Sequence, residues 1–167
     1  DSQIYLNAIK MRKGNTDIKE GNDFHFVECS SMESIKNAMA EKYMEYVEKY
    51  GVLECMCICP YKKHTAGVHE MNQFLQEKVN PASDDKKEVA AKGIIYREGD
   101  VVMHLTNTDE VSNGDIGLIK HIYFDNDGFH IQAEIEKKPM EYTKDNIDQL
   151  TLAYAVSVHK SQGSQAK

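Results

Sequence analysis

Residues 152–165 read LAYAVSVHKSQGSQ, an apolar run that passes abruptly into a polar loop. The run as a whole, Leu150 to Val158, is typical of a strand buried in the middle of a parallel sheet. The loop behind it begins at His159 and Lys160 and continues with hydroxyl, amide and glycine residues. Such a loop can offer cationic side chains and exposed backbone amides to an anion. The stretch therefore predicts an α/β fold with an anion site at the end of one strand.

A second unit of the same kind lies earlier in the chain. Leu53–Cys59 is a strand candidate that ends at Pro60, and the loop YKKHTAG at 61–67 follows it before a helix. If both strands belong to one parallel sheet, both loops emerge at its carboxyl edge, where open α/β sheets bind ligands. Taken singly, each loop is more often a solvated surface turn than a site, and their shared position makes a site an equal alternative. Its cationic side chains would be Lys62, Lys63, His159 and Lys160.

The remaining elements of the first part alternate between strands and helices. Phe24–Val27 is a short strand candidate, and Ser30 with Glu33 forms a capping box for a helix that runs to Tyr50. Apolar residues at helical spacing predict a further helix over 68–79, which must end before Pro81.

The hydrophobic rhythm changes after a polar linker at residues 80–87. Short strand candidates with close turns follow at Val101–Leu105, Gly117–Phe124 and Phe129–Ile135, and Asn113–Gly114 is a tight-turn signal. This pattern predicts a small antiparallel barrel.

Composition limits the possible functions. The net charge of −7 disfavours a protein that coats nucleic acid generally, because phosphate binding relies on cationic side chains. No apolar run is long enough to span a membrane, so no membrane partner is expected. Cys55, Cys57 and Cys59 suggest a metal or redox site, but their alternate spacing fits thiols that fill a strand, and no metal is expected. Reduced cysteines suit a cytoplasmic location.

Several motifs, in order along the chain, resemble the RecD-like branch of superfamily 1 DNA helicases, the exodeoxyribonuclease V alpha-subunit family. AYAVSVHKSQGS at 153–164 resembles motif V of that family. CPYKKHTAGV at 59–68, within a motif IV region at 57–81, is similar to its motif IV. GDVVM at 99–103 and NGDIG at 113–117 are similar to its inserted SH3-like subdomain, and SQIYLNA at 2–8 to the segment after motif III.

This resemblance implies a partial RecA-like parallel sheet of the P-loop NTPase type with helices, interrupted by an SH3-like β-barrel. Residues 1–91 would belong to the second RecA-like domain, 92–149 to the insert, and 150–167 to the return strand and motif V. It also implies DNA contacts by Ser157, His159 and Lys160. Nucleotide contacts would come from Lys62, Lys63, Gln162, Gly163 and Ser164.

The resemblance further implies that the chain is a piece of an ATP-driven helicase that moves 5′ to 3′ on single-stranded DNA. The parent would use ATP and Mg²⁺ and would need its first RecA-like domain, with other exonuclease V subunits if it works in that complex. No G-x-x-x-x-G-K-[ST] loop occurs in the sequence, so we expect the chain alone to bind no cofactor and to contribute no catalytic residue. Tyr61, Thr65, Ser157 and Gln165 depart from the family pattern. The alternative is a non-enzymatic SH3-like interaction or nucleic-acid-binding module on an α/β support.

Overall fold

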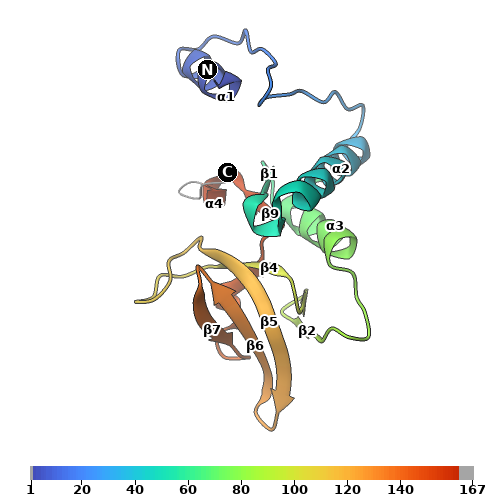
Figure 1. Cartoon of the computed structure of the whole chain (residues 1–167), viewed down its shortest axis with the longest axis vertical. Helices are drawn as coiled ribbons and strands as arrows, with labels where there is room; N and C mark the ends of the chain where they lie inside the picture. The colour runs from blue at the N-terminus through green and yellow to red at the C-terminus, as the bar shows by residue number, and fades with distance from the viewer. Residues whose placement is uncertain (1, 162–167) are drawn as a thin grey trace. The chain divides into compact units, whose positions relative to one another are not determined.

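The computed structural model describes residues 2–161, which divide into a short unit up to Ser31 and a larger unit from Met32 onward (Figure 1). The short unit contains helix α1, Gln3–Arg12, whose first turn is capped by the Ser2 hydroxyl. The side-chain amide of Asn7 is buried and donates to the Lys19 carbonyl at 2.7 Å. The predicted strand at Phe24–Val27 is wrong, because Phe24 forms only an isolated bridge with Gly21. Side chains of this segment are largely exposed, so burial does not stabilise an extended strand there.

The larger unit begins with two helices, both of which confirm the sequence prediction. Helix α2 spans Met32–Tyr50 and ends at Gly51, whose φ of 90° suits the left-handed conformation that follows many helices. Helix α3 spans Val68–Val79 and ends at Asn80, directly before Pro81. The two helices pack together, and the side chains they bury are Ala40, Tyr43, Met71 and Leu75.

A two-stranded parallel sheet lies against α3. Strand β1 spans Cys57–Cys59 and β9 spans Ala155–Ser157, and Cys59 is the partner of Ser157. The first half of the predicted strand 53–59 instead contains a 3₁₀ turn, η1, at Val52–Glu54. Asn72 of α3 attaches β9 to the helix, because its amide donates to the Ala155 carbonyl at 2.8 Å and accepts from the Ala155 amide at 2.9 Å.

The rest of the unit is an antiparallel sheet of five strands in the order β7-β6-β5-β4-β8, with a separate hairpin, β2–β3 (Figure 1). The β4, β5 and β6 strands confirm the prediction, whereas β2, β3 and β7 were not predicted. The predicted antiparallel unit is therefore present as a sheet. Among the described residues its edge strands β7 and β8 do not pair with each other or with the hairpin, so strand pairing does not close it into a barrel. The strand bounds are Glu88–Ala91 (β2), Ile94–Arg97 (β3), Val101–His104 (β4), Ile116–Asp125 (β5), Gly128–Ile135 (β6), Lys138–Tyr142 (β7) and Leu150–Leu152 (β8).

The apolar run that opens the sequence analysis forms two strands rather than one. After a 3₁₀ turn, η2, at Ile147–Gln149, β8 pairs antiparallel with β4, whereas β9 pairs parallel with β1. Ala153 and Tyr154 connect the two strands and are buried. A continuous apolar run does not distinguish one long buried strand from two short ones in different sheets. The chain therefore leaves the antiparallel sheet for the parallel pair through buried backbone.

A buried carboxylate stands where these parts meet. Asp100 follows β3 and is fully buried, and each of its carboxylate oxygens accepts two hydrogen bonds. Oδ2 accepts from Gln76 at 2.6 Å and from the Arg97 backbone amide at 2.7 Å. Oδ1 accepts from Asn80 at 2.8 Å and from the Tyr154 hydroxyl at 2.9 Å. Burial raises the pKa of Asp100, while these four donated bonds favour the ionised form.

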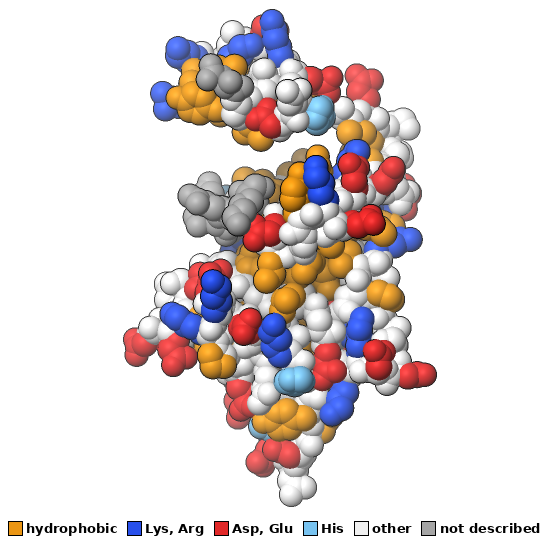
Figure 2. Space-filling view, viewed as in Figure 1, with side chains coloured by type: hydrophobic (Ala, Val, Ile, Leu, Met, Phe, Trp, Pro, Cys, Tyr) orange, Lys and Arg blue, Asp and Glu red, His pale blue; other side chains and the backbone are white. Residues whose placement is uncertain are grey.

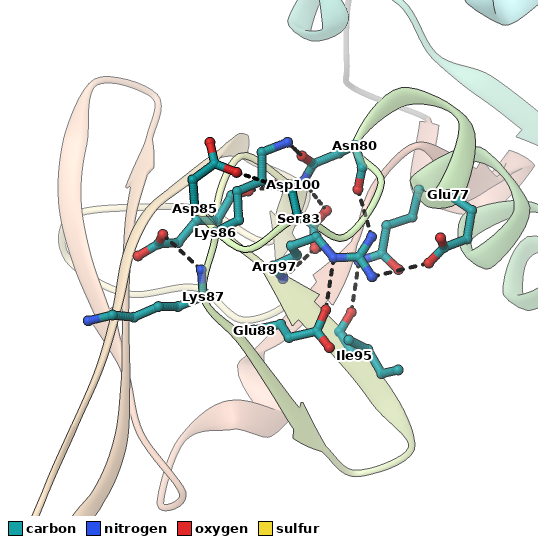
Figure 3. Close-up of polar contacts among 12 residues, drawn as sticks. Glu77, Asn80, Ser83, Asp85, Lys86, Lys87, Glu88, Ile95, Arg97 and Asp100 are labelled. Atoms are coloured by element: carbon teal, nitrogen blue, oxygen red, sulfur yellow. Dashed lines mark hydrogen bonds and ion pairs between the residues drawn. The ribbon is translucent and has the colours of Figure 1, made fainter.

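The side chain of Arg97 extends this junction toward the linker (Figure 3). Its guanidinium is 3% exposed and donates to the Asn80 carbonyl at 2.6 Å, to Glu88 at 3.0 Å and to Glu77 at 3.1 Å. We call Asp100, Arg97 and these partners the junction network. Its members come from α3, from the β2–β3 hairpin and from the connection between β8 and β9. The network therefore fixes the antiparallel sheet against α3 and the parallel pair.

Candidate nucleic-acid interface

The two basic loops leave the parallel pair at the same edge. Cys59 and Ser157 are partners at the ends of parallel strands, so Pro60 and Val158 begin their loops side by side. This confirms the sequence expectation that the two strands run parallel. The four-residue helix α4, Val158–Ser161, continues from β9 and packs against both strands.

The loop between β1 and α3 is built by its own backbone. The Tyr61 carbonyl accepts from the Val68 amide at 2.9 Å, and His64 and Ala66 have positive φ values of 81° and 68°. A Cβ at Gly67 would lie 2.4 Å from the Lys63 carbonyl oxygen, so the chain requires glycine at that position. Non-glycine residues in such conformations persist only where the surrounding structure enforces them. The loop thus has a fixed backbone, and it presents the exposed side chains of Lys62 and Lys63.

The structure separates the predicted site residues of the β9 loop by exposure. Ser157 is 8% exposed within β9. His159 is exposed, and Lys160 is half-buried. Gln162, Gly163 and Ser164 lie outside the described residues. The cationic side chains that the described part of α4 places at this edge are those of His159 and Lys160.

The ammonium of Lys160 contacts a residue that the sequence indicated only as a turn. Its Nζ donates to Oδ1 of Asn113 at 2.5 Å. Asn113 belongs to the β4–β5 turn of the antiparallel sheet, 47 positions away along the chain. The tight-turn signal correctly indicated the local backbone, but nothing in the local pattern could place Asn113 beside Lys160.

Among the described residues, the lysines at this edge lack carboxylate partners. Lys62, Lys63 and Lys160 form no ion pair with any residue among those the structure describes, whereas Lys36 is paired with both Glu33 and Glu70. On the face shown in Figure 2, acidic and basic side chains are intermixed and form no broad basic surface. An anion contact on this face therefore has to be local.

The cysteines of β1 contribute to the core. Cys57 and Cys59 are buried, whereas Ile58 between them is 47% exposed. A hydrogen bond to Cys59, together with burial, raises the pKa of the Cys57 thiol, so it stays protonated. Within residues 2–161, no cluster of three or more His, Cys, Asp or Glu side chains is arranged to hold a metal ion. None of the described helices is long and apolar enough to cross a membrane.

Comparison with known proteins shows similarity to DNA helicases. Residues 71–135 match the family described as the SH3 domain of ATP-dependent RecD-like DNA helicases. The ATP-dependent RecD2 DNA helicase of Deinococcus radiodurans is 26% identical over 110 residues, which are 65% of this chain and 14% of that relative. These findings confirm the resemblance seen in the sequence. Over residues 71–135 the chain is similar to the SH3 domain of RecD-like DNA helicases, and its match covers about a seventh of the RecD2 relative's length.

Solved structures give a more distant likeness. One match is to a structure of two coordinating Pif1 helicases that unwind forked duplex DNA. Its TM-score is 0.48 and its identity 17%, and the match covers 98% of this chain and 38% of the Pif1 chain. Unliganded Pif1 from Bacteroides has a TM-score of 0.39 and 20% identity over 65% of this chain and 42% of its own. Pif1 from Candida albicans has a TM-score of 0.40 and 14% identity over 79% and 44%.

Proposed function

We propose that the intact protein is an ATP-dependent DNA helicase that moves 5′ to 3′ along single-stranded DNA. In this proposal the chain is part of the second RecA-like motor domain, interrupted by the SH3-like insert. The observation that carries it is the pair of basic loops at one edge of β1 and β9, in a chain whose residues 71–135 match a helicase SH3 domain. The direction of movement rests on the motif resemblance.

The structure supports different roles for the residues of the two loops. Lys160 is the strongest candidate for a contact with the DNA backbone, because no described carboxylate neutralises its ammonium. His159 is exposed and would contact the same strand. Ser157, which is buried, would support the loop from within β9 rather than touch DNA. Lys62 and Lys63 would approach the nucleotide, together with Gln162, Gly163 and Ser164.

ATP and Mg²⁺ belong to the intact protein in this proposal. The phosphate-binding loop of such motors is not in this sequence, and phosphoryl transfer depends on positioning and electrostatics from all parts of the site. The purified chain should therefore hydrolyse no ATP, with or without DNA. Single-stranded DNA, the first RecA-like domain and, in a nuclease complex, other exonuclease V subunits are the proposed partners.

The test is to replace Lys160 by Ala in the intact helicase and measure affinity for single-stranded DNA at several salt concentrations. Loss of one phosphate contact should weaken binding alike for all base sequences and lower the slope of log K against log salt by about 0.7. DNA-stimulated ATP hydrolysis should need more DNA to reach half its maximum.

Lys144→Ala is the matched control, because Lys144 is exposed and lies in the turn after β7. That variant should keep the wild-type slope. If the Lys160→Ala protein is folded and its slope, affinity and DNA stimulation equal those of the control, the proposed DNA contact is wrong.

A further inference from the structure

We propose that Asn113 is a positioning residue for the DNA contact made by Lys160. Its side-chain amide orients the lysine ammonium without neutralising it, so the antiparallel SH3-like part of the chain contributes to DNA binding through an uncharged group. The inference rests on the proposed function of Lys160. It adds a residue that lies outside the loop where the sequence motifs place the DNA contacts.

The turn that carries Asn113 is held firmly. The Gly114 amide donates to the His104 carbonyl at 2.8 Å, and the His104 amide donates to the Asp115 carbonyl at 2.8 Å. The Asn113 amide itself donates to the side chain of Asn107 at 2.8 Å. Gly114 has a φ of 104°, which suits glycine. His104 is fully buried in β4, so these bonds attach the turn to the core of the sheet.

A fixed turn gives its side chain a defined direction. The amide of Asn113 reaches Lys160 from a sheet that the junction network fixes against α3, and Asn72 fixes β9 against the same helix. Both partners of the Lys160–Asn113 hydrogen bond are thus anchored to one helix. A long lysine side chain has many rotamers, and holding it in one of them reduces the entropy lost when it binds an anion.

The chemistry of the partner decides what Lys160 can still bind. An amide oxygen is a neutral acceptor, so the ammonium keeps its full charge and two of its three N–H donors. A carboxylate at the same position would form an ion pair and compete with a phosphate for the same charge. Asn113 and aspartate have nearly the same shape, so exchanging them changes the charge beside Lys160 and little else.

The experiment compares four variants of the intact helicase by salt titration of single-stranded DNA affinity: Asn113→Asp, Asn113→Ala, Lys160→Ala and the double variant Asn113→Asp/Lys160→Ala. Asn113→Asp should lower the salt slope by about 0.7, as Lys160→Ala does. Asn113→Ala should keep the slope and weaken binding by about twofold to tenfold, the range for one lost hydrogen bond. The double variant should bind no more weakly than Lys160→Ala, because the two changes act on one contact.

Asn126→Asp is the control, since Asn126 lies in the β5–β6 turn and the substitution adds the same charge to the same sheet. If Lys160→Ala lowers the slope while Asn113→Asp behaves like Asn126→Asp, the positioning role is wrong and the function of Lys160 stands. Additive losses in the double variant overturn the positioning role as well. If Lys160→Ala leaves DNA binding unchanged, the proposed function itself is refuted. Thermal unfolding of each variant verifies that the comparison is between folded proteins.

Discussion

Replacing Asp100 by Asn tests whether the junction network stabilises this fold. The substitution keeps the shape of the side chain but exchanges one acceptor oxygen for an NH₂ group. On the Oδ2 side that group would face two fixed donors, Gln76 and the backbone amide of Arg97. On the Oδ1 side it would face Asn80 and the Tyr154 hydroxyl, which can rotate and accept instead. The amide should therefore occupy the Oδ1 side.

The expected cost follows from that geometry. The rotating Tyr154 hydroxyl regains a partner, whereas the Asn80 amide loses its bond to the carboxylate at a site that is fully buried. Leaving one buried donor unsatisfied costs about 1–3 kcal/mol. Removing a buried negative charge relieves some of the desolvation cost but also removes a favourable electrostatic interaction with Arg97. We therefore expect the free energy of unfolding to fall by about 2 kcal/mol. This is a large part of the free energy of unfolding of a typical domain, which is roughly 5–15 kcal/mol.

The assay is urea unfolding of the purified chain, with wild type and variant compared at pH 7. Asp145→Asn is the matched control, because Asp145 is exposed in the turn before η2, and its free energy of unfolding should be within about 0.5 kcal/mol of wild type. If Asp100→Asn is as stable as this control, the four hydrogen bonds do not hold the junction together and the reasoning fails.

Two further predictions concern the antiparallel sheet. Gly117→Ala should lower the free energy of unfolding by about 3 kcal/mol in urea, because the added Cβ would lie 1.8 Å from the Glu134 carbonyl oxygen of β6 and would force the strands apart. In Gly93→Ala the added Cβ meets no atom within 4 Å, so only the backbone φ of 80° is unfavourable. Its free energy of unfolding should fall by about 1–2 kcal/mol. An equal loss of stability in both variants would contradict the packing argument. Burial lowers the pKa of His104 below its ordinary value of 6.5, so the unfolded chain binds a proton more readily. This residue's contribution to stability is present above about pH 6.5 and is lost as the pH falls from there through the lowered pKa of the folded state. Urea midpoints at pH 7.5 and pH 5.5 should differ more for wild type than for His104→Gln, and an identical difference would show that His104 is not the titrating group.

The sequence predicted those parts of the fold that depend on local periodicity. Helices α2 and α3 and strands β4 to β6 were found from apolar spacing, a capping box and turn residues. The run at 150–158 was misread because its residues are apolar on every face, so nothing local marks the change from one sheet to the other. The segment at 24–27 has strand-forming residues but buries little of them.

The candidate site was predictable only in part for a related reason. Motif spacing and the parallel arrangement indicated the two loops, since both features are local or follow from sheet topology. Asn113 was predicted only as a turn residue. Its contact with Lys160 could not be predicted, because it joins positions far apart in the chain. Asp100 lies in the GDVVM string, yet its four donors come from three different segments, and only the fold brings them together.

A structure of the intact protein bound to single-stranded DNA tests the proposed DNA contact most directly. We expect a backbone phosphate within hydrogen-bonding distance of Lys160 Nζ, with the Asn113 amide still in contact with the same ammonium. We also expect the DNA to cross the edge where β1 and β9 end. A DNA path on another face, with Lys160 bonded only to solvent or to protein, would contradict the account.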